Sequence, residues 1–216
     1  MAAKNPKPTV SLADVANVID TLGLTRLNEC NHLTQWMQSV GKISTAYQEI
    51  LGTARKNLIL NRSNWNEEEL KMRFISLVME ACQIEVEDKI QIFYERPLSG
   101  SIQGYSFAII CDCMVASPTQ GGRPKDPYFF LQEFKKEKGD RNDPEAQMLV
   151  AMLLSQQANA DGKPVYGAWL QGENWYFCVL NGVEYCRSKL FVATDADQLE
   201  KIVYMLQYLK ELILNR

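Results

Sequence analysis

Histidine is almost absent from this chain of 216 residues, with His32 as its single example. Zinc sites that need several imidazoles, and oxidoreductase sites built on two histidines, are therefore excluded within one chain. A catalytic triad could draw only on His32, which borders the apolar positions Leu33 and Trp36 and is interpreted as a packed helix residue. Any metal site has to rest mainly on carboxylates, which favour hard ions such as Mg²⁺.

Paired cysteines and long apolar runs are also lacking. The six cysteines form no Cys-x-x-Cys pair, so we expect reduced, mostly buried thiols. The longest strongly apolar run, 148–154, is too short to span a membrane, and the polar, proline-broken residues 1–8 are unlike a secretory signal. We expect a soluble cytoplasmic protein that does not associate with membranes. The net charge of −3 does not by itself indicate nucleic-acid binding.

The apolar fraction of 46% is ordinary for a globular protein, and the period of the apolar residues changes along the chain. Residues 1–10 are interpreted as a disordered lead, and the pattern from there to about residue 60 is helical. Asn64 or Asn66 is expected to cap a further helix whose first turn holds the acidic run 67–69. This predicts an N-terminal helical extension over 1–62 and a second domain over 63–216.

Beyond residue 88 the pattern favours strands, with two interposed or terminal helices. Strands are predicted over 89–94, 105–110, 112–117, 128–135, 165–170 and 175–180, with a break at 97–104 and a loop at 118–127. Helices are predicted over 143–159, capped by Asp143 with Pro144 at its first position, and from Asp195 or Asp197 to the end. The expected fold class is α+β (α/β), a mixed β-sheet flanked by helices.

One charged motif stands out at the end of the aromatic strand 128–135. Alternation places Glu133 and Lys135 on the same face, and antiparallel counting puts Asp112 opposite Glu133 if Ser117 faces Tyr128. Two carboxylates can hold Mg²⁺, and a neighbouring lysine can activate a water molecule and stabilise negative charge. The alternative is that Glu133 and Lys135 are ordinary surface charges where a strand reaches solvent.

These pieces resemble the PD-(D/E)xK superfamily of restriction-endonuclease-like nucleases. The resemblance covers roughly residues 65–185 and rests on Asp112, on Glu133-Phe134-Lys135 and on the helix that follows. Further matching pieces are the acidic helix start 65–71 and the segments 143–147, 166–167 and 175–177. The resemblance implies a restriction-endonuclease-like core and a Mg²⁺-dependent nuclease that hydrolyses DNA, with Mn²⁺ as a substitute ion.

The resemblance also implies the role of each site residue. Asp112 and Glu133 would be metal ligands, and Lys135 would position the attacking water. Glu67 matches an acidic residue that many members supply from the first core helix, as a third ligand. Gln147 falls where some members carry a glutamine, and it shares a helix face with apolar residues.

Two alternatives remain open from the sequence. Cys111 stands where the family pattern has proline, and Ser106 would take the acidic position in another hairpin register, leaving the site inactive. The chain would then be a nuclease-fold module that binds nucleic acid or protein without catalysis. The apolar stripe of the C-terminal helix is a candidate surface for a homodimer. The basic loop 121–125, together with Lys136, Lys138 and Arg141, could meet a phosphate backbone, although their acidic neighbours favour an ordinary solvated surface.

Overall fold

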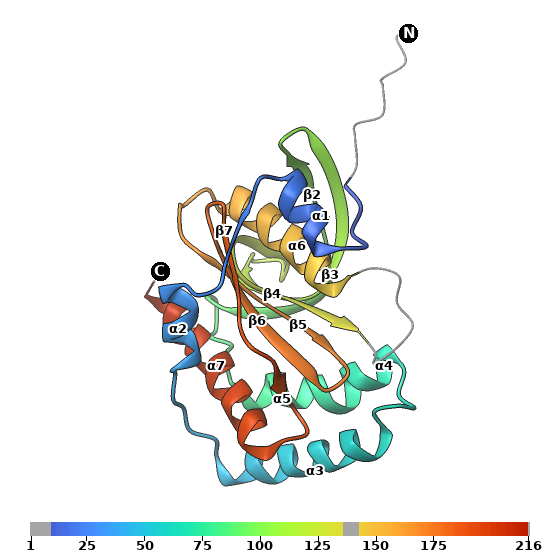
Figure 1. The fold of residues 1–216 in the computed structure, drawn as a ribbon. Coiled ribbons are helices and arrows are strands. Elements are labelled where there is room, and N and C mark those ends of the chain that lie inside the picture. Colours follow the sequence, from blue (N-terminus) through green and yellow to red (C-terminus); the bar gives the residue numbers. More distant parts are fainter. Residues whose placement is uncertain (1–9, 136–142, 216) are drawn as a thin grey trace.

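The protein forms one mixed sheet with helices on both faces (Figure 1). A computed structural model describes residues 10–135 and 143–215. The eight strands follow the order β1-β7-β6-β5-β4-β3-β2, with β8 pairing with β6. They are β1 (Thr25–Leu27), β2 (Gln91–Ile102), β3 (Tyr105–Pro118), β4 (Pro124–Lys135), β5 (Val165–Gln171), β6 (Asn174–Asn181), β7 (Glu184–Arg187) and β8 (Phe191–Val192). The predicted fold class, a mixed sheet flanked by helices, is confirmed.

The helices divide between the two faces of the sheet. They are α1 (Val15–Thr21), α2 (Asn31–Met37), α3 (Thr45–Asn61), α4 (Glu67–Leu70), the π-helical turn η1 (Lys71–Ile75), α5 (Ser76–Ala81), α6 (Pro144–Asn159) and α7 (Ala196–Leu214). Helices α1 and α6 pack together on one face, while α2, α3, α5 and α7 share a core on the other. Helix α6 is apolar on nearly all sides and is buried, as its sequence predicts.

The helix starts follow the capping signals in the sequence. Asn66 and Glu69 exchange the two hydrogen bonds of a capping box at the start of α4. Asp143 caps α6 ahead of Pro144, and Asp195 caps α7. These three predicted caps are confirmed, and the first of them fixes the start of the helix that carries Glu67.

Helices of the predicted extension share the core of the rest of the chain. The Trp36 indole Nε1–H donates to the backbone carbonyl of Met205 at 2.6 Å, and its ring meets Phe130 and Phe177 edge-on. Residues 25–27, predicted as helical, instead form β1, which pairs in parallel with β7. Strands of two to four residues are too short for an alternating pattern to show, so β1, β7 and β8 were not predicted. The division at residue 62 stays a prediction, and the expected disordered lead lies largely outside the described residues.

The predicted break at 97–104 is wrong over 97–102, where β2 continues, and is confirmed only at the turn 103–104. Pro97 pairs with Ile110, and the chain turns only at Gln103 and Gly104, which both have positive φ. An edge strand tolerates proline because one side of its backbone is not needed for the ladder. The two predicted strands on either side of Cys111 are likewise one continuous strand, β3.

The C-terminal helix directs its apolar stripe into the chain's own core. Of the predicted stripe, Ile213 is partly buried against the same core, and the other five residues are at most 4% exposed: Leu199, Ile202, Val203, Leu206 and Leu209. This stripe therefore presents no free surface to a second copy, and a homodimer through α7 gains no support from it. The cysteines are all unpaired thiols, and five of the six are buried, as predicted. Among the described helices, none combines the length and apolarity that a bilayer crossing requires.

Candidate active site

The hairpin of β3 and β4 brings Asp112 beside the Glu133–Lys135 motif. Cys113 faces Gln132 in the antiparallel ladder, so the next step of the register sets Asp112 against Glu133. The expected pairing of Ser117 with Tyr128 is wrong, because Ser117 faces Lys125 and irregularities shift the register near the loop. The irregular stretch lies at the loop end, and the predicted juxtaposition at the other end holds.

Asp112 is anchored by the backbone of the opposite strand. The N–H of Phe134 donates to Asp112 Oδ2 at 2.7 Å, and the residue is only 6% exposed. Ser106, the alternative for the acidic position, faces Ser101 near the turn of the β2–β3 hairpin. The register therefore places Asp112, not Ser106, next to the motif.

Glu133 and Lys135 lie side by side, as their spacing predicts. Lys135 Nζ is 3.0 Å from Glu133 Oε1. Glu133 is 3% and Lys135 9% exposed, and the strand that carries them is flanked by β5 in parallel and β3 antiparallel. The interpretation as ordinary surface charges at a strand end is therefore wrong.

Helix α4 brings Glu67 to the same place. Its carboxylate lies 3.8 Å from Lys135 Nζ and 3.2 Å from Lys71 Nζ. The helix begins at Glu67, where the capping box fixes its first turn. The structure thus brings together four of the five predicted site residues, which are Glu67, Asp112, Glu133 and Lys135.

Two residues that the sequence did not single out complete this group, Lys71 and Glu95. Lys71 Nζ is 2.7 Å from Glu95 and 3.3 Å from Asp112. Lys71 follows Glu67 by four residues, a helical spacing that places both on one face, so this signal was available. Glu95 gave no signal: it has a φ of +52°, and the β2–β3 ladder omits it between Tyr94 and Arg96. We call Glu67, Lys71, Glu95, Asp112, Glu133 and Lys135 the carboxylate–lysine cluster.

Burial raises the pKa of both strand carboxylates. Burial and the nearby charge of Asp112 raise the pKa of Glu133 to about 8, against the stabilising influence of Lys135. Burial also raises the pKa of Asp112, although the Phe134 N–H and Lys71 favour its charged form. At neutral pH the Glu133 carboxyl therefore tends to keep its proton, and a cation bound beside it would favour its charged form.

The two lysines respond in the opposite sense. Burial disfavours the charged form of Lys71, but its hydrogen bond to Glu95 and the charge of Asp112 outweigh burial and raise its pKa. Burial is likewise outweighed at Lys135, whose pKa the charge and hydrogen bond of Glu133 raise. Both lysines remain cationic, so each can orient an anion or a polarised water.

Gln147 is not shown to join the cluster. It lies in the first turns of α6, and its side-chain Oε1 is buried with no hydrogen-bond partner among the described residues. A buried acceptor without a hydrogen bond lowers the stability of the fold, so packing alone does not account for a glutamine at this position. Its role in the site stays a prediction.

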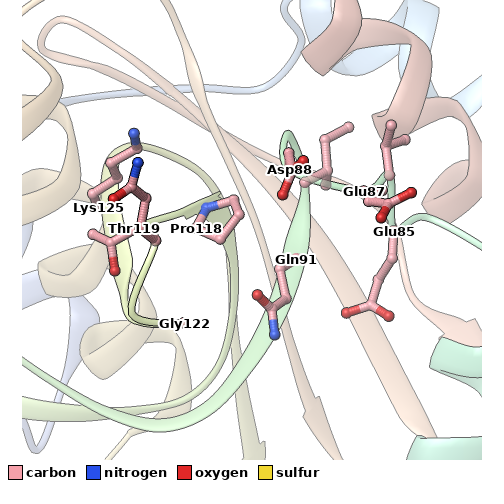
Figure 2. A pocket seen from close by; sticks show the side chains of 11 residues that line it. Glu85, Glu87, Asp88, Gln91, Pro118, Thr119, Gly122 and Lys125 are labelled. Carbon is pink, nitrogen blue, oxygen red and sulfur yellow. The ribbon is translucent and has the colours of Figure 1, made fainter.

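A large pocket lies elsewhere, between the turn before β2 and the β3–β4 loop (Figure 2). It has a volume of about 750 Å³, with Glu85, Glu87 and Asp88 on one side and Lys125 on the other. None of its lining residues belongs to the carboxylate–lysine cluster. Of the basic residues considered as phosphate contacts, Arg123 and Lys125 are exposed, and Lys136, Lys138 and Arg141 lie outside the described residues.

The donor set of the cluster fits magnesium in kind. Asp112 and Glu133 supply buried carboxylate oxygens, and Mg²⁺ is commonly held by one or two carboxylates with waters and substrate phosphates. Within residues 10–135 and 143–215, no three or more His, Cys, Asp or Glu side chains are arranged to hold a metal ion by themselves. A two-carboxylate site is thus compatible with the arrangement, whereas a complete protein cage is not.

Comparison with known proteins assigns no family. No protein-family model and no curated protein matches the chain. Among solved structures, a chain in the cryo-EM structure of a DrdV–DNA complex is similar, with a TM-score of 0.41 and 12% identity. The match covers 75% of this chain and 14% of that chain, so this chain spans only a small part of its length. At that TM-score the likeness assigns neither a family nor an activity.

Proposed function

We propose that this protein is a Mg²⁺-dependent nuclease of the restriction-endonuclease-like type that hydrolyses phosphodiester bonds in DNA. The observation that carries the proposal is the convergence of Asp112, Glu133 and Lys135 at one end of the β3–β4 hairpin. Strand ends that merely reach solvent do not need two carboxylates and a lysine below 10% exposure. Burying such charges is costly, which indicates that the arrangement is kept for a purpose other than stability.

Each residue has a distinct part in the proposed chemistry. Asp112 and Glu133 would hold Mg²⁺, or Mn²⁺ in its place. Glu67, predicted as a third ligand, pairs with Lys71 and Lys135, and no set of three ligands forms among the described residues, so its part in metal binding stays a prediction. The bound metal would supply Lewis-acid polarisation of a phosphate oxygen. Lys135, 3.0 Å from Glu133, would orient the attacking water and stabilise the charge that develops on the phosphate.

A second candidate function is a nuclease-fold module that binds nucleic acid or protein without catalysis. One observation favours it: the Lys71 ammonium lies within 3.5 Å of Glu67, Glu68, Glu95 and Asp112. A fixed lysine at this point compensates the carboxylates without a metal ion. Metal-dependent cleavage separates the two candidates.

The test is incubation of the purified chain with single- and double-stranded DNA and with RNA, in Mg²⁺, in Mn²⁺ and in a chelator. We expect metal-dependent cleavage of DNA that Glu133→Ala abolishes. Glu87→Gln, an exposed carboxylate outside the cluster, is the matched control and should cleave as the wild type does. Cleavage that survives Glu133→Ala would overturn the assignment of the site, and no cleavage of any substrate would favour the non-catalytic module.

A further inference from the structure

Lys71 lies at the centre of the carboxylates and has no part in the proposed chemistry. Its ammonium contacts an inner pair, Asp112 at 3.3 Å and Glu67 at 3.2 Å. It also contacts an outer pair, Glu95 at 2.7 Å and Glu68 at 3.5 Å. The Lys71 side chain itself is 14% exposed. Most of the negative charge around the site thus converges on one internal cation.

The local helix geometry supports this position. Lys71 opens the π-helical turn η1, where the N–H of Ser76 donates to the Lys71 carbonyl. π-Helical turns are rare in proteins, and those that occur often lie at functional sites. The ammonium also lies 5.9 Å from the centre of the Phe134 ring, next to the backbone bond that anchors Asp112. The lysine is therefore held over β4, the strand that carries Glu133 and whose Phe134 N–H anchors Asp112 of β3.

We propose that Lys71 is a tethered counter-cation that competes with the divalent ion for Asp112 and has to move outward before the ion binds. This inference rests on the proposed function, because it concerns the same carboxylates. An ammonium and a divalent ion that both contact the Asp112 carboxylate repel each other, and the ammonium occupies the Asp112 oxygen that does not accept from the Phe134 N–H. Lys71 thus weakens metal binding and, in exchange, holds the cluster together when no ion is present.

The two outer partners of Lys71 are exposed, so its ammonium can move toward solvent and still contact them. The inner carboxylate of Asp112 is 8% exposed, whereas the side chains of Glu95 and Glu68 are 55% and 76% exposed. A lysine that turns toward solvent can keep these two outer partners while it releases Asp112. The flexible stem of lysine makes such a move feasible without a change of the helix.

The test measures Mn²⁺ binding to the full chain by calorimetry, with no substrate present. Lys71→Met keeps the length of the stem and removes the charge, and we expect it to bind Mn²⁺ at least about tenfold more tightly, which corresponds to about 1.4 kcal/mol. Lys71→Arg keeps the charge and should bind as weakly as the wild type. Lys89→Met, an exposed lysine in the turn before β2, is the control and should leave the affinity unchanged.

A charge-balanced variant guards against misfolding of Lys71→Met. The double variant Lys71→Met with Glu95→Gln removes one charge of each sign, and we expect it also to bind Mn²⁺ more tightly than the wild type. Without metal, Lys71→Met should melt at a lower temperature than the wild type, and Mn²⁺ should restore more of its stability than it adds to the wild type. Tighter binding without any nuclease activity would leave this inference standing and overturn the proposed function. If neither variant binds Mn²⁺ more tightly than the wild type, the inference is overturned.

Discussion

The backbone N–H of Phe134 donates to the carboxylate of Asp112 at 2.7 Å, so one strand of the hairpin fixes the acid of the other. The same carboxylate faces Lys71 with its second oxygen. Asp112 therefore serves the fold through one oxygen and the charge balance of the site through the other. Substitutions of Asp112 that keep the Phe134 hydrogen bond but remove the charge can separate these two roles.

We predict that Asp112→Ala destabilises the protein by about 1–3 kcal/mol, because it leaves the buried Phe134 N–H without an acceptor. Asp112→Asn should cost less, since its amide oxygen can still accept that hydrogen bond, although it removes the charge. Both variants should lose metal-dependent cleavage. Urea unfolding followed by fluorescence gives the stabilities, and equal losses for the two variants would contradict the structural role of the bond.

A second prediction concerns pH. Since the pKa of Glu133 rises from 4.5 to about 8 on folding, the native protein keeps a proton that the unfolded chain releases in between. The contribution of Glu133 to the free energy of unfolding should therefore fall as the pH rises from about 4.5 to about 8, and level off above. Glu133→Gln should flatten this part of the profile. Denaturant unfolding at several pH values measures it, with Glu87→Gln as a control that keeps the slope.

Removal of the Lys135 ammonium should affect the reaction more than metal binding. We expect Lys135→Ala to lower the rate of DNA cleavage by about 10²–10⁴-fold, the range for a group that assists proton transfer. Mn²⁺ should still bind, because Asp112 and Glu133 remain. Single-turnover cleavage and calorimetry measure the two quantities, and Lys89→Ala is the matched control. An unchanged rate would remove Lys135 from the site.

Gln147 allows a prediction in which stability and activity move in opposite directions. Its buried Oε1 lacks a partner among the described residues, so Gln147→Leu should raise the free energy of unfolding by about 1 kcal/mol. If Gln147 contributes to the site as predicted, the same variant cleaves DNA more slowly. Thermal unfolding and the cleavage assay test both effects. A loss of stability would indicate that the amide is needed by the fold instead.

Local signals in the sequence predicted the parts of the fold that depend on neighbouring residues. The caps at Asn66, Asp143 and Asp195 and the shared face of Glu133 and Lys135 each depend on residues within a few positions. The proline at 97 misled the strand prediction, because its effect depends on whether the strand lies at an edge of the sheet. Whether a strand lies at the edge depends on the order of all the strands in the sheet, which the residues of one segment do not determine.

The centre of the site could not be predicted for a similar reason. Lys71 meets Asp112 and Glu95 only after a helix and two strands have packed together. The spacing of Glu67 and Lys71 indicates a shared helix face. No pattern in the sequence predicts the π-helical turn or the left-handed backbone of Glu95. Sequence reasoning thus found the residues of the motif and missed the cation that they surround.

The irregular edge strand β2 also affects how readily the protein associates with itself. It ends the strand order, and an exposed edge of this length is a template on which another chain can add a strand and begin to aggregate. Pro97 removes one donor from the strand, and the irregular backbone at Glu95 interrupts its regular repeat two residues earlier. An incoming strand could not form a continuous ladder across this region. The irregularity that brings Glu95 to Lys71 thereby also protects the protein against edge-to-edge aggregation.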